Sequence, residues 1–173
     1  LVLTEADQLK GLPDFVKSAA KQLAKERGLE QHNAHAFTLS RSSITPFMTF
    51  SERRDLRESM WLAWCKRGEN PGAHNNETVM KEILKIRLAQ ARLLGYQNFS
   101  EYALADTMAG SAANARDLLM RVWTPARLRA IQEREDLKML SGLSDLAAWD
   151  WHFWTERVRK EKFDLNEAEI KPY

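Results

Sequence analysis

The chain has 173 residues, of which 44% are hydrophobic, and its 26 basic and 24 acidic residues give a formal net charge of +2. This length suits one domain with a core of ordinary size, and the mean hydropathy of −0.51 argues against a membrane protein. Because the opposite charges are well mixed, we expect neither nucleic acid nor a membrane as a partner. The start LVLTEADQLKG shows no signal peptide, and a single cysteine, Cys65, fits a reducing compartment, so we expect a cytoplasmic protein.

The first helix signal is PDFVKSAAKQLAKERG, with Pro13 at the first helical position and Gly28 just past the end. Its expected buried face consists of Phe15, Val16, Ala19, Ala20 and Leu23. The best strand candidate is AFTLS at 36–40, and LVL at 1–3 is its expected partner. Both segments are short, so any sheet is a minor ribbon.

The next helix is predicted to begin after Ser51, as its N-cap, and to end at Gly68. Its expected inward residues are Leu56, Met60, Trp61 and Trp64. A loop, ENPGAHNN, then leads to a strong helix signal from Glu77 to Leu94, stopped by Gly95. Apolar residues cover more than half of this helix's circumference, which predicts a central place in a bundle.

A short helix is expected in NFSEYALADTMAG, ending near Gly110, and Ser111 is predicted to cap a long helix after it. Pro125 lies inside that long pattern and removes a backbone donor, so we expect a kink or break near Thr124. The closing segment from Trp149 is again helical. The sequence therefore predicts an all-α helical bundle with at most one short β-strand pair, forming a single domain, or a fragment of one, over 1–173.

Residues for chemistry are sparse. His32 and His35 are close enough to share a metal, with Glu30 nearby, but no third ligand is fixed by spacing, so an exposed loop is the favoured interpretation. We expect His152, among aromatics, to be a partly buried, hydrogen-bonded histidine, and Cys65 to be a buried cysteine near a helix end. HExxH, GxSxG and phosphate-loop patterns are absent from the sequence. We therefore assign no catalytic and no metal-binding residue.

Two basic runs are candidate nucleic-acid sites, RRDLR at 53–57 and RVRKEK at 157–162. Acidic residues are interleaved with the basic ones in and beside both runs. This pattern is typical of solvated helices with ion pairs between successive turns, so we interpret both runs in that way.

Several landmarks in order resemble the zinc oligopeptidase family that includes thimet oligopeptidase, oligopeptidase A and bacterial peptidyl-dipeptidase. The stretches that carry the resemblance are LTEADQLKGLPDF, AFTLSRSSITPFM, RRDLRESMWLAW, ETVMKEILKIRLAQARLLGYQNFSEYALADTMAG and WDWHFWTERVRKEKFDLNEAEIKPY. Together they extend over nearly all of the chain. The closing stretch is especially similar to the peptidyl-dipeptidase (dipeptidyl carboxypeptidase) branch.

The resemblance implies a large helical enzyme split by a channel, in which zinc held by HExxH and a glutamate activates water for attack on the peptide bond. It implies zinc and short peptide substrates for a full-length parent that removes C-terminal dipeptides. None of the family's zinc ligands has a counterpart here, and the chain lacks an initiator Met and ends at KPY. We therefore expect an inactive, noncatalytic fragment that binds no zinc and whose partner is the remainder of the parent peptidase.

The aromatic segment has two sides in this interpretation. Trp149, Phe153 and Val158 recur at roughly helical spacing and are expected to form a buried seam. Trp151 and Trp154 face partly elsewhere, so we expect them to pack against the rest of the parent or to line its substrate channel. The alternative function is a stand-alone helical module that binds protein or peptide without enzymatic activity.

Overall fold

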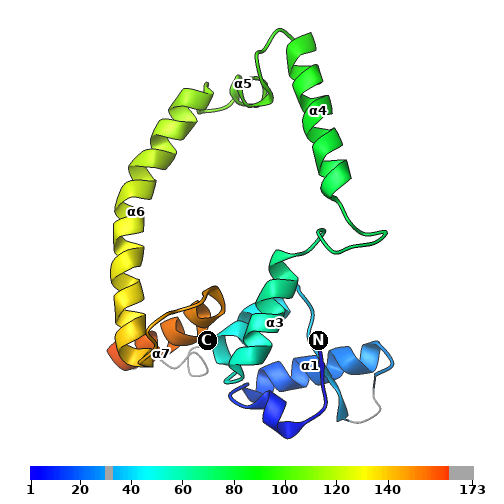
Figure 1. Cartoon of the computed structure of the whole chain (residues 1–173), viewed down its shortest axis with the longest axis vertical. Helices are drawn as coiled ribbons and strands as arrows, with labels where there is room; N and C mark the ends of the chain where they lie inside the picture. Colours follow the sequence, from blue (N-terminus) through cyan, green and yellow to red (C-terminus); the bar gives the residue numbers. More distant parts are fainter. Residues whose placement is uncertain (30–32, 164–173) are drawn as a thin grey trace. The chain divides into compact units, whose positions relative to one another are not determined.

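The computed structural model describes residues 1–29 and 33–163, which are mainly helical (Figure 1). The α-helices in these residues are α1 (Asp14–Glu26), α2 (Arg41–Phe50), α3 (Arg54–Cys65), α4 (Glu77–Leu93), α5 (Phe99–Leu104), α6 (Ala112–Ser141) and α7 (Trp151–Phe163). Two short 3-10 helices, η1 (Ala6–Leu9) and η3 (Ala148–Asp150), and two strands, β1 (Val2–Leu3) and β2 (His35–Ala36), complete the described elements. The predicted all-α fold class is confirmed.

The chain gathers into two compact units. Unit 1 joins Leu1–Cys65 to Glu133–Tyr173, and unit 2 is the intervening segment Lys66–Gln132. Helix α6 begins in unit 2 and ends in unit 1. That residues 1–173 form a single domain stays a prediction.

The two strands of unit 1 pair antiparallel, with Val2 opposite Ala36 and Leu3 opposite His35. The amide of Phe37 donates to the carbonyl of Leu1 at 2.8 Å, which extends the ladder by one position. The predicted ribbon is therefore confirmed, although its second strand lies at His35–Ala36 rather than across 36–40.

Helix α2 lies in a stretch for which the sequence predicted neither a helix nor a strand. It runs through Pro46, which cannot donate a backbone hydrogen bond. Burial compensates for this loss, because Ile44, Phe47 and Met48 all enter the core and Phe47 is fully buried. The Phe47 ring meets the Phe37 ring at 4.8 Å between centroids. Tertiary packing thus outweighs local propensity here.

Helix α1 packs on β2 through a narrower face than expected. Val16, Ala20 and Ala24 are buried at successive four-residue intervals, which places them on one stripe of the helix. Phe15 and Ala19 lie off this stripe and are exposed, so their predicted burial was wrong. The core around this stripe and α2 also contains Leu3, Leu12, Phe37 and Met60.

Helix α3 begins at Arg54 instead of directly after Ser51. Ser51 is buried at the end of α2, where its amide donates to the carbonyl of Phe47 at 3.0 Å, so it does not cap α3. Met60 is buried as predicted, but Trp64 is 40% exposed. Cys65 is exposed as well, because the last turn of α3 extends beyond the core, and the prediction that it is buried was wrong.

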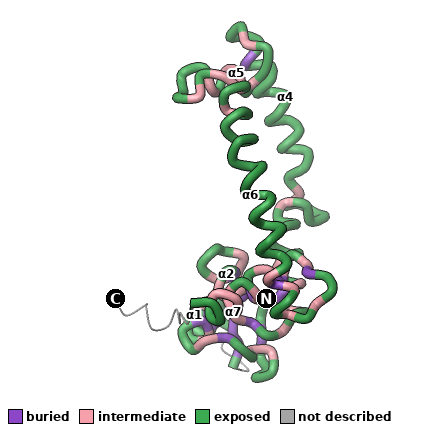
Figure 2. The backbone as a smooth tube through the Cα atoms, turned by 90° about the vertical axis from the view of Figure 1, so that its left-hand side faces the viewer, coloured by how far each residue is buried: buried purple, intermediate pink, exposed green. Residues whose placement is uncertain are grey.

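In unit 2, α4 spans nearly the predicted residues, but its predicted central position was wrong for the described chain. α4 packs on α5, and Ala91 is its one buried residue. Its other apolar side chains are exposed because no further layer of unit 2 packs over them. Figure 2 shows the buried residues concentrated in unit 1, with α4 and most of α6 exposed.

The remaining unit 2 boundaries differ in part from expectation. Helix α5 ends at Leu104, several residues before Gly110. The Ser111 hydroxyl accepts a hydrogen bond from the Asn114 amide at 3.1 Å, as predicted for the cap of α6. Helix α6 is continuous through Pro125, so the predicted break is absent. The predicted kink near Thr124 stays a prediction.

No helix among the described residues is long and apolar enough to cross a membrane.

Candidate functional site

The aromatic segment that begins at Trp149 is held in place by a buried carboxylate. Asp150, the last residue of η3, is fully buried. Its Oδ2 accepts from Arg54 Nη2 at 2.8 Å, and its Oδ1 accepts from Arg57 Nη2 at 3.0 Å. The Ala147 amide also donates to Oδ2, at 3.2 Å. A buried charge is tolerated only when it is paired and hydrogen-bonded, and Asp150 meets both conditions.

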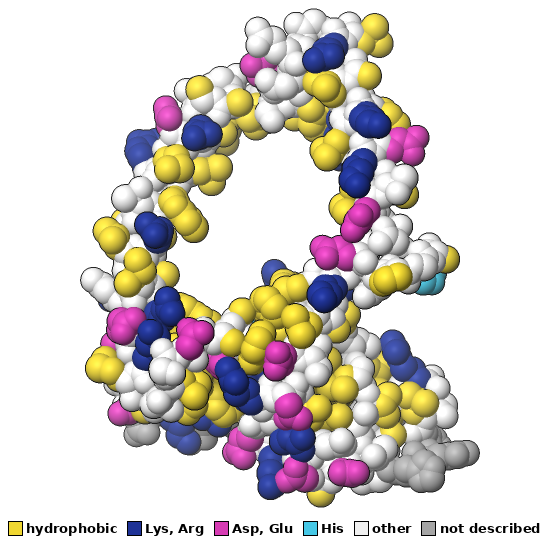
Figure 3. Space-filling view, viewed as in Figure 1, with side chains coloured by type: hydrophobic (Ala, Val, Ile, Leu, Met, Phe, Trp, Pro, Cys, Tyr) yellow, Lys and Arg dark blue, Asp and Glu magenta, His cyan; other side chains and the backbone are white. Residues whose placement is uncertain are grey.

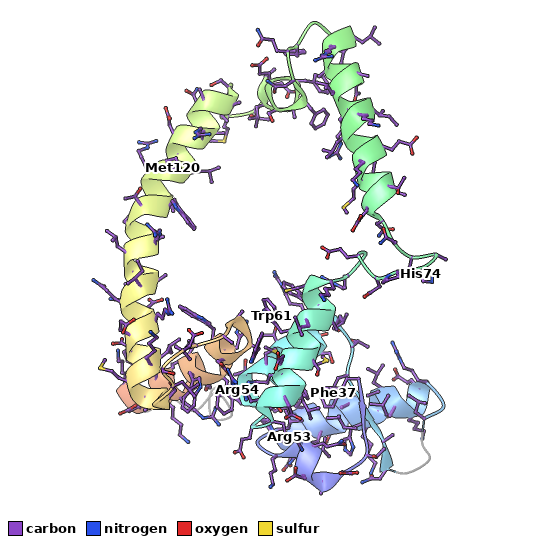
Figure 4. All side chains as sticks on the ribbon, in the orientation of Figure 1. Phe37, Arg53, Arg54, Trp61, His74 and Met120 are labelled. Carbon is purple, nitrogen blue, oxygen red and sulfur yellow. The ribbon has the colours of Figure 1, made fainter. Side chains whose placement is uncertain are left out.

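Arg57 links three segments of unit 1. It is only 2% exposed, and besides Asp150 it donates from Nε to the carbonyl of Trp149 at 3.1 Å. Its Nη1 donates to the carbonyl of Ser51 at 2.7 Å, at the junction between α2 and α3. We call Arg54, Arg57, Trp149 and Asp150 the Asp150 cluster. It ties η3, and therefore the start of α7, to α3, on which Figure 4 labels Arg54.

The charges of the cluster perturb one another in a defined direction. Burial by itself raises the pKa of Asp150, but hydrogen bonds from Arg54, Arg57 and the Ala147 amide outweigh burial and hold the pKa below its ordinary value. Burial lowers the pKa of Arg57, although the hydrogen bond to Asp150 acts in the opposite direction. Arg54 is half exposed, and the hydrogen bond to Asp150 raises its pKa. The cluster therefore favours an ionised Asp150.

Aromatic rings surround this ion cluster. The Trp61 ring of α3 meets the Trp149 ring edge-on at 5.7 Å, and Trp149 packs against the main core. Phe153, one turn into α7, is buried, with the guanidinium carbon of Arg57 at 4.0 Å from its ring centroid. The guanidinium carbon of Arg157 lies at 3.3 Å from the same centroid. Such cation–π contacts fix both arginines against the ring.

The predicted channel residues lie on α7 beside this support. Trp151 and Trp154 are both half-buried, so neither ring is enclosed by the described chain. Trp154 contacts the Phe153 ring edge-on at 5.2 Å. Phe153 is buried, as the predicted seam requires, but Val158 is only half-buried and shares the side of α7 that carries Trp151 and Trp154, seven and four residues before it. The structure thus presents two partly open indoles on a firmly anchored helix.

The other candidate residues do not assemble into a site. His35 is buried in β2 rather than in an exposed loop, and burial lowers its pKa. His32 and Glu30 lie outside the described residues, so their predicted proximity to His35 stays a prediction. His152 is exposed on α7, so its predicted partial burial was wrong. Its ring points outward because Phe153, its neighbour in the chain, occupies the buried side of the helix.

The residues that hold α7 were missed by the sequence interpretation. The run 53–57 was interpreted as a solvated helix face, yet Arg57 is buried and both Arg54 and Arg57 bind Asp150. The available signal was an arginine pair at i and i+3 on one helix, together with a lone aspartate among tryptophans. Each feature suggests a partner of opposite charge, but no rule of sequence spacing pairs residues that lie more than 90 positions apart.

A protein-family model described as Peptidase family M3 matches residues 47–173. The chain belongs to this family. Oligopeptidase A of Haemophilus influenzae is 35% identical over 181 residues, covering 100% of this chain and 26% of the relative. Dipeptidyl carboxypeptidase of Salmonella typhimurium is 32% identical over 177 residues, with the same coverage of 100% and 26%. Probable cytosolic oligopeptidase A of Arabidopsis thaliana is 34% identical, covering 99% of the chain and 26% of the relative.

The M3 chain therefore spans about a quarter of the length of the curated relatives it matches. The matched residues include α3, η3 and α7, and so the whole Asp150 cluster. Among the described residues, no group of three or more His, Cys, Asp or Glu side chains is placed to hold a metal ion. The donors among residues 1–29 and 33–163 are therefore not arranged as a zinc site, and no chemical step is assigned to them.

Proposed function

We propose that this M3 chain is a noncatalytic helical segment of a zinc metallopeptidase whose full-length form removes C-terminal dipeptides from oligopeptides. The observation that carries the proposal is the match to proteins named dipeptidyl carboxypeptidase along 100% of this chain but only 26% of theirs. In this proposal the zinc and its ligands belong to the remainder of the parent chain, where the metal would polarise the peptide bond and activate water. A cytoplasmic location is part of the same proposal.

The role proposed for this segment is to form part of the substrate channel. Trp151 and Trp154 are half-buried, and large flat indoles bind extended peptides well because they offer apolar area at low entropic cost. The Asp150 cluster and Phe153 supply the rigid support that such a wall needs. The short peptide substrate would contact the exposed edges of the two rings.

The first experiment compares the product of the natural reading frame with the 173-residue chain. The substrates are oligopeptides that are blocked at the amino end and free at the carboxyl end. We expect the full-length protein to release C-terminal dipeptides in a chelator-sensitive reaction, and the 173-residue chain to release none. Cleavage within the peptides, without dipeptide release, would keep the M3 assignment and reject the dipeptidase specificity. Chelator-sensitive dipeptide release by the 173-residue chain would reject the noncatalytic role.

A second experiment tests the channel residues in the full-length protein. Trp151→Ala and Trp154→Ala should each raise KM with little change in melting temperature, since neither ring is part of the buried core. His152→Ala, on the exposed side of the same helix, is the matched control and should leave KM unchanged. Equal KM values for all three variants and the parent would show that the indoles do not touch substrate.

The alternative function, a free-standing helical module, makes a different prediction. The natural frame would then end near residue 173 and its product would bind a protein or peptide without cleaving it. The exposed apolar side chains of unit 2 are the feature that such a module would use.

A further inference from the structure

Unit 2 lacks a hydrophobic core of its own. Ala91 is the only buried residue in Lys66–Gln132, all of which the structure describes. The same segment exposes many large apolar side chains along α4 and the first part of α6 (Figure 3). A helix must bury its apolar stripe against another element to be stable. The exposed faces of unit 2 therefore require a covering layer.

Helix α4 needs neighbours on two sides. One stripe consists of Val79, Ile83 and Ile86, which are 53%, 42% and 59% exposed. A second stripe consists of Met80, Leu84 and Leu88, which are 49%, 65% and 36% exposed. The stripes lie on different sides of the helix: Met80 and Leu84 each follow a residue of the first stripe by one position, about 100° around the helix, and Leu88 follows Ile86 by two.

The third side of α4 is polar, and we expect this side to face the solvent. Lys81, Lys85 and Arg92 share this side at intervals of four and seven residues. A helix that is apolar on two sides and basic on the third lies between two layers with one edge in water. α5 packs on α4 but leaves both stripes exposed.

We propose that helices from the remainder of the parent polypeptide pack on both stripes of α4. This inference rests on the proposed function, in which the 173 residues are one segment of a longer peptidase. Three quarters of the length of the matched relatives lies outside the region that this chain covers, which is ample material for two further layers. A second copy of this chain fits less well, because a two-fold interface buries one patch per subunit and leaves the other stripe bare.

The test uses Ile83→Glu and Leu84→Glu, one on each stripe, with Lys85→Glu as a control on the polar side. In the full-length protein, each stripe variant should lower the melting temperature by several degrees, and the control should not. In the 173-residue chain, both stripe variants should melt like the unmodified chain, because the altered side chains are exposed there. Loss of stability in one context and not in the other is specific to a cover supplied from outside residues 1–173.

Two results would overturn the proposal. The stripes are bare in the parent if both full-length variants melt like the control. The cover is a second copy if the 173-residue chain is a stable dimer, Leu84→Glu makes it a monomer, and the full-length variants melt normally. Peptidase activity is assayed separately, so a full-length protein without it would refute the proposed function while the melting comparison still decides the packing.

Discussion

Replacing Asp150 with asparagine tests whether the buried ion cluster holds unit 1 together. Asparagine keeps the size of the side chain but removes the negative charge, which leaves Arg57 buried at 2% exposure without a counter-charge. It also turns an amide NH2 towards arginine donors that need acceptors. Breaking a buried pair from one side costs about 3–5 kcal/mol of unfolding free energy. For a chain of this size, that corresponds to a fall in melting temperature of about 6–20 °C.

The assay is thermal and urea unfolding, followed by circular dichroism and by the fluorescence of the six tryptophans, which include Trp149 in the cluster and Trp61 against it. Asp55→Asn is the matched control, because Asp55 also pairs with an arginine, Arg53, but is 60% exposed. An exposed pair contributes less than about 1 kcal/mol, so the control should change stability little. If Asp150→Asn costs no more than Asp55→Asn, the cluster does not hold η3 and α7 in place.

Three further predictions use other features of unit 1. The pKa of Asp150 in the folded chain lies below its ordinary value of 3.8, so the stability that Asp150 contributes is present above pH 3.8 and lost as the pH falls through the folded pKa. Acid titrations of stability should show this loss in the unmodified chain and not in Asp150→Asn. Gly11→Ala should lower the free energy of unfolding in urea more than Gly28→Ala does. Both glycines have positive φ, so both substitutions strain the backbone. At Gly11 the added Cβ would also collide with the Phe50 carbonyl, whereas a Cβ at Gly28 would have no atom within 4 Å. Equal losses would mean that the loop at Gly11 moves aside. Cys65 should react with a thiol reagent in the folded chain as fast as in denaturant, since it is exposed; strong protection would place it in an interface.

The local features of this fold were predictable because their signals lie within a few residues of one another. The bounds of α4 follow from an unbroken apolar period ending at a glycine, and the Ser111 cap follows from one hydroxyl before a helical pattern. The short ribbon between β1 and β2 was also predictable from two β-rich segments, to within a few residues. Family membership followed from the order of motifs, which needs no three-dimensional knowledge.

The misses share a physical cause, which is that burial depends on contacts distant in sequence. Arg57 stands in a charged run that is typical of a solvated surface, and only Asp150, 93 residues away, makes its burial tolerable. Trp64 and Cys65 continue the apolar pattern into the last turn of α3, yet both are exposed there. For α4 the apolar faces were recognised correctly. Whether other elements cover these faces cannot be read from the apolar pattern of α4 itself.

The Asp150 cluster also explains how a discontinuous unit can position α7. Unit 1 is built from two segments separated by the whole of Lys66–Gln132, so its two parts must find each other across a long loop. The entropy of closing such a loop grows only slowly with its length, by about 0.6 kcal/mol for each doubling. Removing one partner of a buried carboxylate costs about 3–5 kcal/mol, several times that difference, so the loss of Arg57 should disturb the position of α7 more than a change in the length of unit 2 would. Trp151 and Trp154 can therefore keep a fixed place relative to α3 while unit 2 is shaped by whatever packs on α4.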